Sequence, residues 1–355
     1  MSERTTQSLL GGIWIAASLM ALGCHPSASA MPTPSPSSTS SKTNATALKQ
    51  AHDEPYIAKL DGNHALVGTL WDTTTNSQID LATLASRLAI SDVILLGEKH
   101  DHPDHHRLQA ALISQIASDH PTVAFEMIDV DQQNTVDRVL GAPGSANTRD
   151  LATQRADALA SETQWEKRGW PSWSMYRPVM VEALLGGGSI LGANYPKDAT
   201  RALVRGGGNV DPDTAKRLGL DRELPAGQQS ALDEELKASH CGHMPDAMLG
   251  PMGKAQRARD GQMAEIIVQG LSKSKKAVLI AGAGHVRRDR GVPWVLSSMK
   301  PSARSLSIAF VEVSAGANSL ADYSARYSAK TMPFDVVWFT PRLDDNDPCE
   351  AFHKK

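Results

Sequence analysis

Aromatic residues are scarce in this chain of 355 residues, at 5% of the total, and neither sign of charge is in large excess. The formal net charge of −3 gives no support for nucleic-acid binding, which relies on an excess of positive charge. Only 3 cysteines are present, too few for a disulfide scaffold. Residues 9–22 form an apolar stretch that is too short to span a bilayer. What remains is an ordinary globular composition, with 41% hydrophobic and 21% charged residues.

The apolar stretch near the N-terminus is typical of a signal peptide. It runs into Ala21-Leu22-Gly23-Cys24, which resembles the lipobox of bacterial lipoproteins. In those proteins the chain is cut before the cysteine, whose thiol then carries lipid. We therefore predict a lipoprotein signal peptide over residues 1–23 and lipidation of Cys24. A plain secretory signal, cut near Ala28 or Ala30, is the alternative.

The segment after this cysteine has no core-forming pattern. Residue 25 is His rather than Asp, so the usual inner-membrane retention signal of enteric bacteria is absent. This favours a lipid anchor in the outer membrane, facing the periplasm. Residues 25–47 are dominated by Pro, Ser, Thr and Ala, and such a stretch cannot bury enough apolar surface to become ordered. We predict a lipid-anchored, disordered tether over residues 24–55.

The rest of the chain alternates apolar runs with helical patterns. Strands are expected over residues 66–71, 92–97, 122–127, 188–193, 277–282, 305–312 and 335–340, and helices over 78–89, 103–118, 178–186 and 252–271. This alternation predicts an α/β fold, a mostly parallel sheet flanked by helices. Residues 128–187 and 197–272 are too long for simple crossovers, so we predict helical insertions that form a smaller cap. The domain is expected to cover residues 56–345, and a C-terminal tail residues 346–355.

Two copies of a G-x-x-H pattern each follow a short apolar run. Gly97-Glu98-Lys99-His100 follows the run at 92–96, and Gly282-Ala283-Gly284-His285 follows the run at 277–281. Both runs are typical of buried strands in a parallel sheet. Ligand crevices in such sheets lie beyond the carboxyl ends of the strands. The two histidines are therefore predicted to converge in space and to mark a site.

The first strand end is rich in polar residues, with four histidines and three carboxylates over residues 97–106. These side chains could supply nitrogen and oxygen ligands to a metal, or they could simply be solvated residues around a helix start. His102, His105 and His106 fall in the first helical turn, so at most two of them are expected to face the crevice. His100, still in the loop, is the better candidate.

Two charged residues occupy apolar surroundings. Glu126 ends the next expected strand, where burial would raise its pKa unless a cation lies nearby. Arg259 lies on the apolar stripe of the helix expected over 252–271, where a charge needs a partner. An internal ion pair and a bound carboxylate-bearing ligand are the two explanations that the sequence leaves open for Arg259.

The few aromatic residues are concentrated in one segment, which contains Trp165, Trp170, Trp173 and Tyr176. This density suits either a flat apolar ligand or the core of a small helical cap. Tyr195 follows the expected strand at 188–193 and brings a hydrogen-bonding side chain to the same sheet edge.

One further cluster, His240-Cys241-Gly242-His243, looks like a metal knuckle, although it lacks a second pair of ligands. A disulfide between Cys241 and Cys349 is compatible with an oxidising envelope, but the sequence does not decide whether the two cysteines pair.

These motifs together resemble the ChaN-like haem-binding lipoproteins, a branch of the Tiki/erythromycin-esterase-like superfamily. The resemblance extends over about residues 90–295, and the matching pieces are residues 93–101, 105–106, 124–127, 173–178, 240–245, 255–260 and 281–285. The ordered set is much more specific than any single piece. It implies a lipid-anchored protein that binds haem in haem or iron uptake, as a homodimer, with an outer-membrane haem receptor as a partner.

The resemblance also implies which residues contact haem. A tyrosine-type axial ligand is expected, because a phenolate suits ferric iron. Tyr176 is the first candidate, since the aromatic segment matches the family there, and Tyr195 is the second. The further expected contacts are Trp173, His100, His285 and Arg259.

The same superfamily supplies a rival hypothesis, since its Tiki-like members resemble metal-dependent proteases. Glu98, His100, Glu126 and His285 could hold a divalent metal that activates water, with the two glutamates as catalytic groups. The sequence therefore leaves open whether the chain is an enzyme. A third hypothesis is an envelope protein with a vestigial site that only binds partners.

Overall fold

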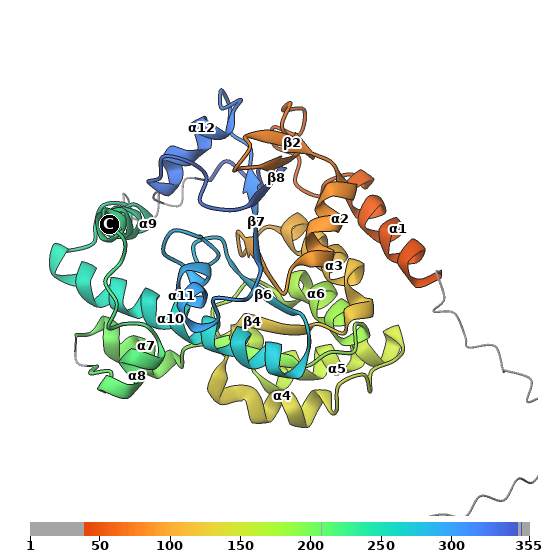
Figure 1. Cartoon of the computed structure of the whole chain (residues 1–355), viewed down its shortest axis with the longest axis horizontal. Helices are drawn as coiled ribbons and strands as arrows, with labels where there is room; N and C mark the ends of the chain where they lie inside the picture. Colours follow the sequence, from red (N-terminus) through yellow and green to blue (C-terminus); the bar gives the residue numbers. More distant parts are fainter. Residues whose placement is uncertain (1–38, 207, 347–348, 350–355) are drawn as a thin grey trace, which may run out of the picture. The chain divides into compact units, whose positions relative to one another are not determined.

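The computed structural model describes residues 39–206, 208–346 and 349, and a single sheet runs through them (Figure 1). Its strands are β1 (Leu70–Asp72), β2 (Ser77–Ile79), β3 (Val93–Glu98), β4 (Thr122–Asp129), β5 (Ile190–Asn194), β6 (Ala277–Gly282), β7 (Ser305–Glu312) and β8 (Val336–Thr340). Their order is β2-β1-β8-β7-β3-β6-β4-β5. β1 pairs antiparallel with β2 and β8, and all the other pairs are parallel. The predicted α/β class with a mostly parallel sheet is confirmed.

Helices cover both faces of the sheet (Figure 1). They are α1 (Thr39–Asp53), α2 (Leu81–Ile90), α3 (Pro103–Gln115), α4 (Gln133–Leu140), α5 (Arg149–Glu162), α6 (Trp173–Leu185), α7 (Lys197–Val204), α8 (Pro212–Arg217), α9 (Gln228–Ser239), α10 (Asp246–Lys273), α11 (Val292–Met299) and α12 (Leu320–Ser324). None of the helices in the described part of the chain has the length and apolarity needed to cross a membrane.

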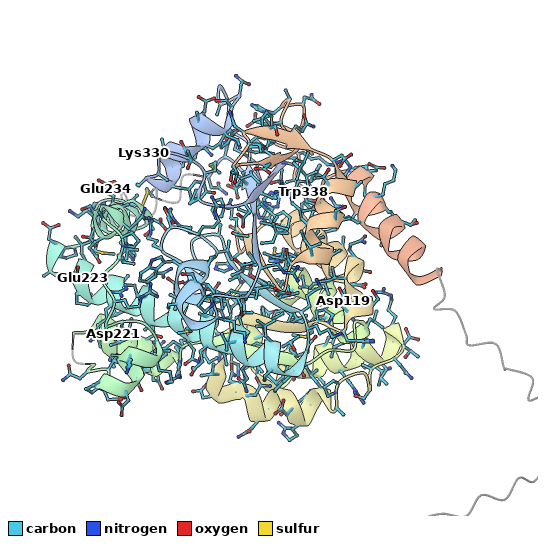
Figure 2. The ribbon with its side chains drawn as sticks, in the orientation of Figure 1. Asp119, Asp221, Glu223, Glu234, Lys330 and Trp338 are labelled. Carbon is cyan, nitrogen blue, oxygen red and sulfur yellow. A yellow bond between two sulfur atoms is a disulfide. The ribbon has the colours of Figure 1, made fainter. Side chains whose placement is uncertain are left out.

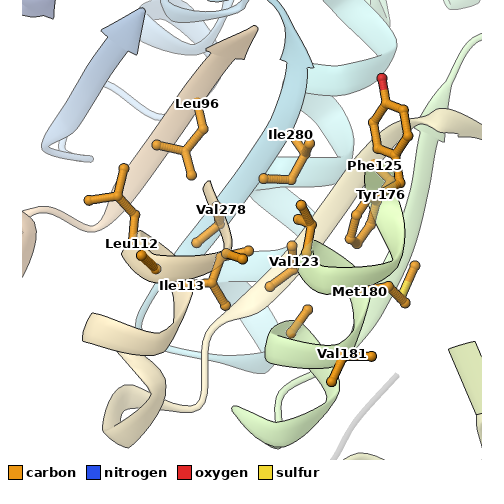
Figure 3. Close-up of a cluster of buried hydrophobic side chains, with 14 of the residues drawn as sticks. Leu96, Leu112, Ile113, Val123, Phe125, Tyr176, Met180, Val181, Val278 and Ile280 are labelled. Atoms are coloured by element: carbon orange, nitrogen blue, oxygen red, sulfur yellow. The ribbon is translucent and has the colours of Figure 1, made fainter. Parts of the chain in front are cut away.

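Successive side chains of a strand point to opposite faces of the sheet, so alternate residues contact different helices. Leu96 and Ile280 belong to one buried cluster, together with side chains of α3 and α6 (Figure 3). Leu95 and Leu279, one position earlier on the same two strands, belong to the cluster beneath α10 and α11. Trp338 on β8 is fully buried (Figure 2). Both faces of these strands are buried, as their continuous apolar runs predict.

The two long intervals between strands are helical, as predicted. Residues 128–187 contain α4, α5 and α6, and residues 197–272 contain α7 to α9 and nearly all of α10. α6 packs against α3, and α10 packs against β4, β5 and β6. These two helices therefore help to cover the sheet itself. α6 begins at Trp173, before the predicted start at residue 178, and carries Pro178 inside it.

Helix α1 lies within residues 24–55, for which the sequence predicts a disordered tether. Leu48 and Ala51 are buried, and α1 contacts α3. Because these two apolar residues are three positions apart, they share one helical face, and their burial against α3 orders a segment that is otherwise polar. The predicted signal peptide, Cys24 and the first part of the tether lie outside the described residues.

A disulfide joins Cys241 to Cys349, which settles the pairing that the sequence leaves open. It ties the loop between α9 and α10 to a residue of the predicted C-terminal tail. Most of that tail lies outside the described residues.

Candidate functional site

The two G-x-x-H segments lie side by side, as predicted. β3 and β6 are parallel neighbours, and Gly97 pairs with Ala281 in their register. A Cβ atom on Gly97 would lie 2.3 Å from Cγ2 of Val286, so only glycine allows the second loop to approach β3 this closely. The close approach brings the loops that carry His100 and His285 to one edge of the sheet.

Glu98 is the buried anchor of the first loop. Its Oε1 accepts hydrogen bonds from the hydroxyl of Tyr176 at 2.5 Å and from Nδ1 of His100 at 2.9 Å. Its Oε2 lies 3.1 Å from Nδ1 of His106. Burial alone would raise the pKa of Glu98, but the positive charges of His106 and His100 outweigh it and lower this pKa to about 2. Glu98 is therefore ionised at neutral pH.

Glu126 connects the two loops. Its Oε2 accepts a hydrogen bond of 2.7 Å from the backbone N–H of Gly282. Its Oε1 is paired with the guanidinium of Arg259 and lies 3.4 Å from Nε2 of His285 and 3.8 Å from Nε2 of His100. Burial favours a raised pKa for Glu126, but these cations hold it well below its usual value. Three cationic groups, His285, His100 and Arg259, thus lie close to Glu126 and prevent the rise in pKa that burial alone would cause.

Two different side chains hold the guanidinium group of Arg259. Besides the ion pair with Glu126, its Nε donates a hydrogen bond of 2.9 Å to Oδ1 of Asn194 at the end of β5. The structure therefore shows the internal ion pair, one of the two explanations left open for this residue. The side chain of Arg259 is still 20% exposed.

Asp260 is a site residue that the sequence argument missed. Its Oδ1 lies 2.6 Å from Nδ1 of His285, and burial raises the pKa of Asp260. Burial by itself would lower the pKa of His285, but Glu126 and Asp260 raise it to about 9. His285 is therefore an imidazolium held between two carboxylates. The signal in the sequence was the position of Asp260 next to Arg259 on a buried helix.

Because His285 is positively charged in the folded protein, the free energy of unfolding should depend on pH. Its pKa is raised from 6.5 to about 9, so its stabilising contribution is fully present below pH 6.5 and is lost as pH rises through 9. At 1.36 kcal/mol per pKa unit, the loss is roughly 3 kcal/mol. Urea unfolding at a series of pH values should show this fall in the free energy of unfolding, and His285→Gln should flatten it. Equal pH profiles for the two proteins would contradict the assignment.

His102 and His105 do not face the crevice. Both are fully buried, and their stacked rings have centroids 4.0 Å apart. Nε2 of His102 is hydrogen-bonded to the carbonyl of Pro341, and Nε2 of His105 is hydrogen-bonded to the hydroxyl of Thr340. Burial and the neighbouring histidines hold the pKa of His105 well below its usual value. These two histidines are neutral packing residues, and His106 acts indirectly by supporting Glu98.

The aromatic segment mostly forms core. Tyr176 is fully buried, and its ring packs 5.0 Å from Trp165 and 4.1 Å from His106. Trp173 packs against Trp165, and its Nε1 donates a hydrogen bond of 2.8 Å to Asp157. Of the two explanations for the aromatic density, the structure thus favours the core of a helical layer.

Tyr176 was the first candidate for an axial ligand, and its position argues against that role. Its hydroxyl is directed at the Glu98 carboxylate, and burial together with that negative charge raises the pKa of Tyr176 far above its usual value. A phenolate at this position would lie against a carboxylate. Tyr176 therefore orients Glu98.

His100 and Tyr195 are expected haem contacts that lie near the surface of this edge. The side chain of His100 is 33% exposed, and its ring contacts Trp170 edge-on at 5.1 Å. Tyr195 follows Asn194 directly and is partly exposed, with its ring against the small apolar cluster between α7 and α10. Trp170 is the second residue that sequence reasoning did not place in the site.

The four residues of the proposed metal site, Glu98, His100, Glu126 and His285, do converge. Their polar atoms are engaged mainly with one another and with Arg259 and Asp260 as ion pairs. Across residues 39–206, 208–346 and 349, no group of three or more His, Cys, Asp or Glu side chains is arranged to hold a metal ion.

A family model described as haem-binding uptake, Tiki superfamily, ChaN matches residues 84–296, a range that contains both G-x-x-H loops, Glu126, Tyr195 and Arg259. The chain belongs to this family. Haem is accordingly the cofactor of this chain, as the sequence resemblance indicated. A comparison with curated proteins found no match.

Solved structures confirm the fold. The structure "Cofacial heme binding to ChaN of Campylobacter jejuni" has a TM-score of 0.57 and 23% identity, over 76% of this chain and 95% of that chain. The type III effector HopBA1 has a TM-score of 0.38 and 13% identity, over 74% of this chain and 93% of its own. A Bacillus cereus protein has a TM-score of 0.31 and 12% identity, over 86% of this chain and 81% of its own. The last two similarities are too weak to support an argument.

Proposed function

We propose that this ChaN-family chain binds ferric haem at the carboxyl edge of its sheet and serves haem or iron uptake. The observation that carries the proposal is the set of groups at that edge: a partly exposed phenol, an accessible imidazole and a partly exposed guanidinium. Haem needs an axial ligand and cations for its propionates, and these residue types supply both.

Each of these residues would have a separate role in binding haem. Tyr195 would hold the iron, because a phenol that reaches the surface can lose its proton to a ferric ion. Arg259 would face the propionates, and His100 with Trp170 would line the other side of the site. The bound haem would supply the iron chemistry, while the protein supplies orientation and charge.

The charge of the cluster suits a dianionic ligand. Three carboxylates, Glu98, Glu126 and Asp260, face four cationic groups: His100, His106, His285 and Arg259. The pKa of each of these histidines is raised despite burial, because each lies beside a carboxylate. The raised pKa values favour the cationic forms of the three histidines, and cations suit an anionic ligand.

Among the residues that the structure describes, the cavity that reaches the strand-end cluster is too small for a porphyrin. The cavity that reaches Asp260 and Gln256 measures only about 10 Å³, and cavities of 420 to 760 Å³ are lined by other residues. Bound ligands normally bury most of their surface. We therefore propose that a second copy of the chain covers the haem, an arrangement compatible with the cofacial haem binding named for the Campylobacter protein.

Haem-dependent dimerisation tests this proposal. Sedimentation velocity of the protein with and without haemin should show a shift from monomer towards dimer at one haem per chain. Arg259→Gln should weaken both haem binding and dimerisation, whereas the surface variant Arg217→Gln should not. A haem complex that stays monomeric would contradict the shared site.

We also propose that the chain is a lipoprotein of the outer membrane that faces the periplasm, with an outer-membrane haem receptor as a partner. The N-terminal sequence and Cys24 support this proposal. Cys24→Ser should release the protein from the membrane fraction. A variant that still carries lipid and stays in the membrane would refute it.

A metal-dependent hydrolase remains a second candidate because Glu98, His100, Glu126 and His285 meet at one point. Metal analysis of the purified protein, followed by peptide and ester substrates, tests it. A tightly held divalent metal together with hydrolysis lost in Glu126→Gln would favour this candidate over haem binding.

A further inference from the structure

A cavity of about 420 Å³ lies where α9 ends and α10 begins, apart from the strand-end cluster. Its lining contains His240, His243, Met244, Met248 and Met252, with Val204 of α7. Most of the lining residues therefore carry a thioether or an imidazole. Simple apolar packing would be served as well by leucines, so this concentration of sulfur and nitrogen donors calls for a chemical explanation.

The donor set selects among ligands. Thioethers and imidazoles are soft or borderline ligands, and the combination suits Cu(I) rather than Mg²⁺ or Ca²⁺, which prefer oxygen. Among the described residues, the lining contains no carboxylate, and no lysine or arginine that could hold the propionates of a haem. The cavity thus differs from the proposed haem site in both charge and donor type.

The hydrogen bonds of His240 prepare it as a ligand. Its Nδ1 lies 2.8 Å from the backbone carbonyl of Leu236, which can only accept a hydrogen bond, so Nδ1 carries the proton. When Nδ1 carries the only ring proton, Nε2 keeps its lone pair and can bind a metal. Metal-binding histidines commonly donate their other N–H to a backbone carbonyl in this way. The disulfide at Cys241 fixes the adjacent backbone.

Met248 and Met252 lie four positions apart on α10, so they share one face of the helix. Residues at this spacing have Cβ atoms about 5–6 Å apart, and their flexible side chains can bring two sulfur atoms to a single ion. His240, the residue that follows α9, lines the same cavity and is the third candidate ligand. Because both remaining cysteines of the folded part are joined in a disulfide, thioethers are the sulfur donors here.

We propose that His240, Met248 and Met252 bind one Cu(I) ion, at a site separate from the haem site. Such a site would let the protein carry a second redox metal, and it does not depend on the haem proposal.

The test is a Cu(I) titration of the full chain carrying Cys24→Ser, which removes the one cysteine outside the disulfide. Cu(I) is supplied as its acetonitrile complex in competition with bicinchoninate, without thiol reductants, and a thiol assay confirms that the disulfide stays intact. We expect one Cu(I) per chain, with sulfur and nitrogen scatterers in the X-ray absorption spectrum.

The double variant Met248→Leu/Met252→Leu keeps the side-chain volume and removes both sulfur atoms. Since losing even an outer-shell partner costs about 10–100-fold in metal affinity, this variant should lose at least about tenfold. His240→Gln should also weaken binding, and Met299→Leu on α11 is the matched control. Circular dichroism confirms folding, and haemin binding should be unchanged in all variants.

Unchanged Cu(I) affinity in the double variant, or an equal loss in Met299→Leu, would overturn the proposal. A double variant that loses haem affinity and keeps its Cu(I) affinity would also overturn the proposal, because the cavity would then belong to the haem site.

Discussion

Replacing Tyr195 by Phe should weaken ferric haem binding at least about tenfold, equivalent to 1.4 kcal/mol, and should remove the absorption of the phenolate–iron bond. The substitution removes only the hydroxyl group. The ring keeps its packing against the cluster that contains Leu203 and Leu218, so the fold should be unaffected. Titration with haemin followed by absorbance measures both quantities.

Tyr176→Phe is the matched control for this prediction. It removes the hydrogen bond to Glu98, and a hydrogen bond to a charged group contributes about 1.5–3 kcal/mol, so unfolding should become easier. The haem spectrum should not change. If Tyr176→Phe removes the phenolate band and Tyr195→Phe keeps it, the assignment is reversed and the helix that carries Tyr176 must move on binding.

Glu126→Gln should lower the free energy of unfolding at pH 7 by about 3–5 kcal/mol, because removing one member of a buried ion pair leaves charge without compensation. The side chain of Glu126 is 1% exposed, and three cationic groups depend on it: His100, His285 and Arg259. Glutamine has almost the same shape and can still accept the hydrogen bond from Gly282. The effect therefore reports charge rather than packing, and urea unfolding measures it.

Glu265→Gln makes the same chemical change at a partly exposed pair, where Glu265 faces Arg217. An exposed pair contributes at most about 1 kcal/mol. The loss in Glu126→Gln should also shrink above pH 9, where His285 loses its proton. Equal losses for the two variants at pH 7 would mean that the buried cluster does not stabilise the fold.

The sequence predicted the position of the site because parallel strands deliver their carboxyl ends to one edge. His100, Glu126 and His285 each follow an apolar run, and the register of β3 with β6 brings them together. Arg259 was found because a charge on an apolar stripe needs a partner. Local patterns of this kind follow from strand and helix periodicity alone.

Other features depended on tertiary contacts that no local pattern encodes. Tyr176 is buried because Trp165 and His106 pack on its ring, and the density of aromatic residues alone did not distinguish a core from a binding face. Asp260 acquires its role only when the loop of His285 folds onto α10. Helix α1 is ordered by the burial of Leu48 and Ala51, two apolar residues in a polar segment.

We propose that this ChaN-family chain binds haem at the carboxyl edge of its sheet. The decisive measurement is a haemin titration of the full chain, followed by Soret absorbance, with metal analysis of the same preparation. We expect a saturable, shifted Soret band at one haem per chain that weakens in Tyr195→Phe. The absence of a specific band, together with a tightly held divalent metal, would refute haem binding at this edge and favour the hydrolase.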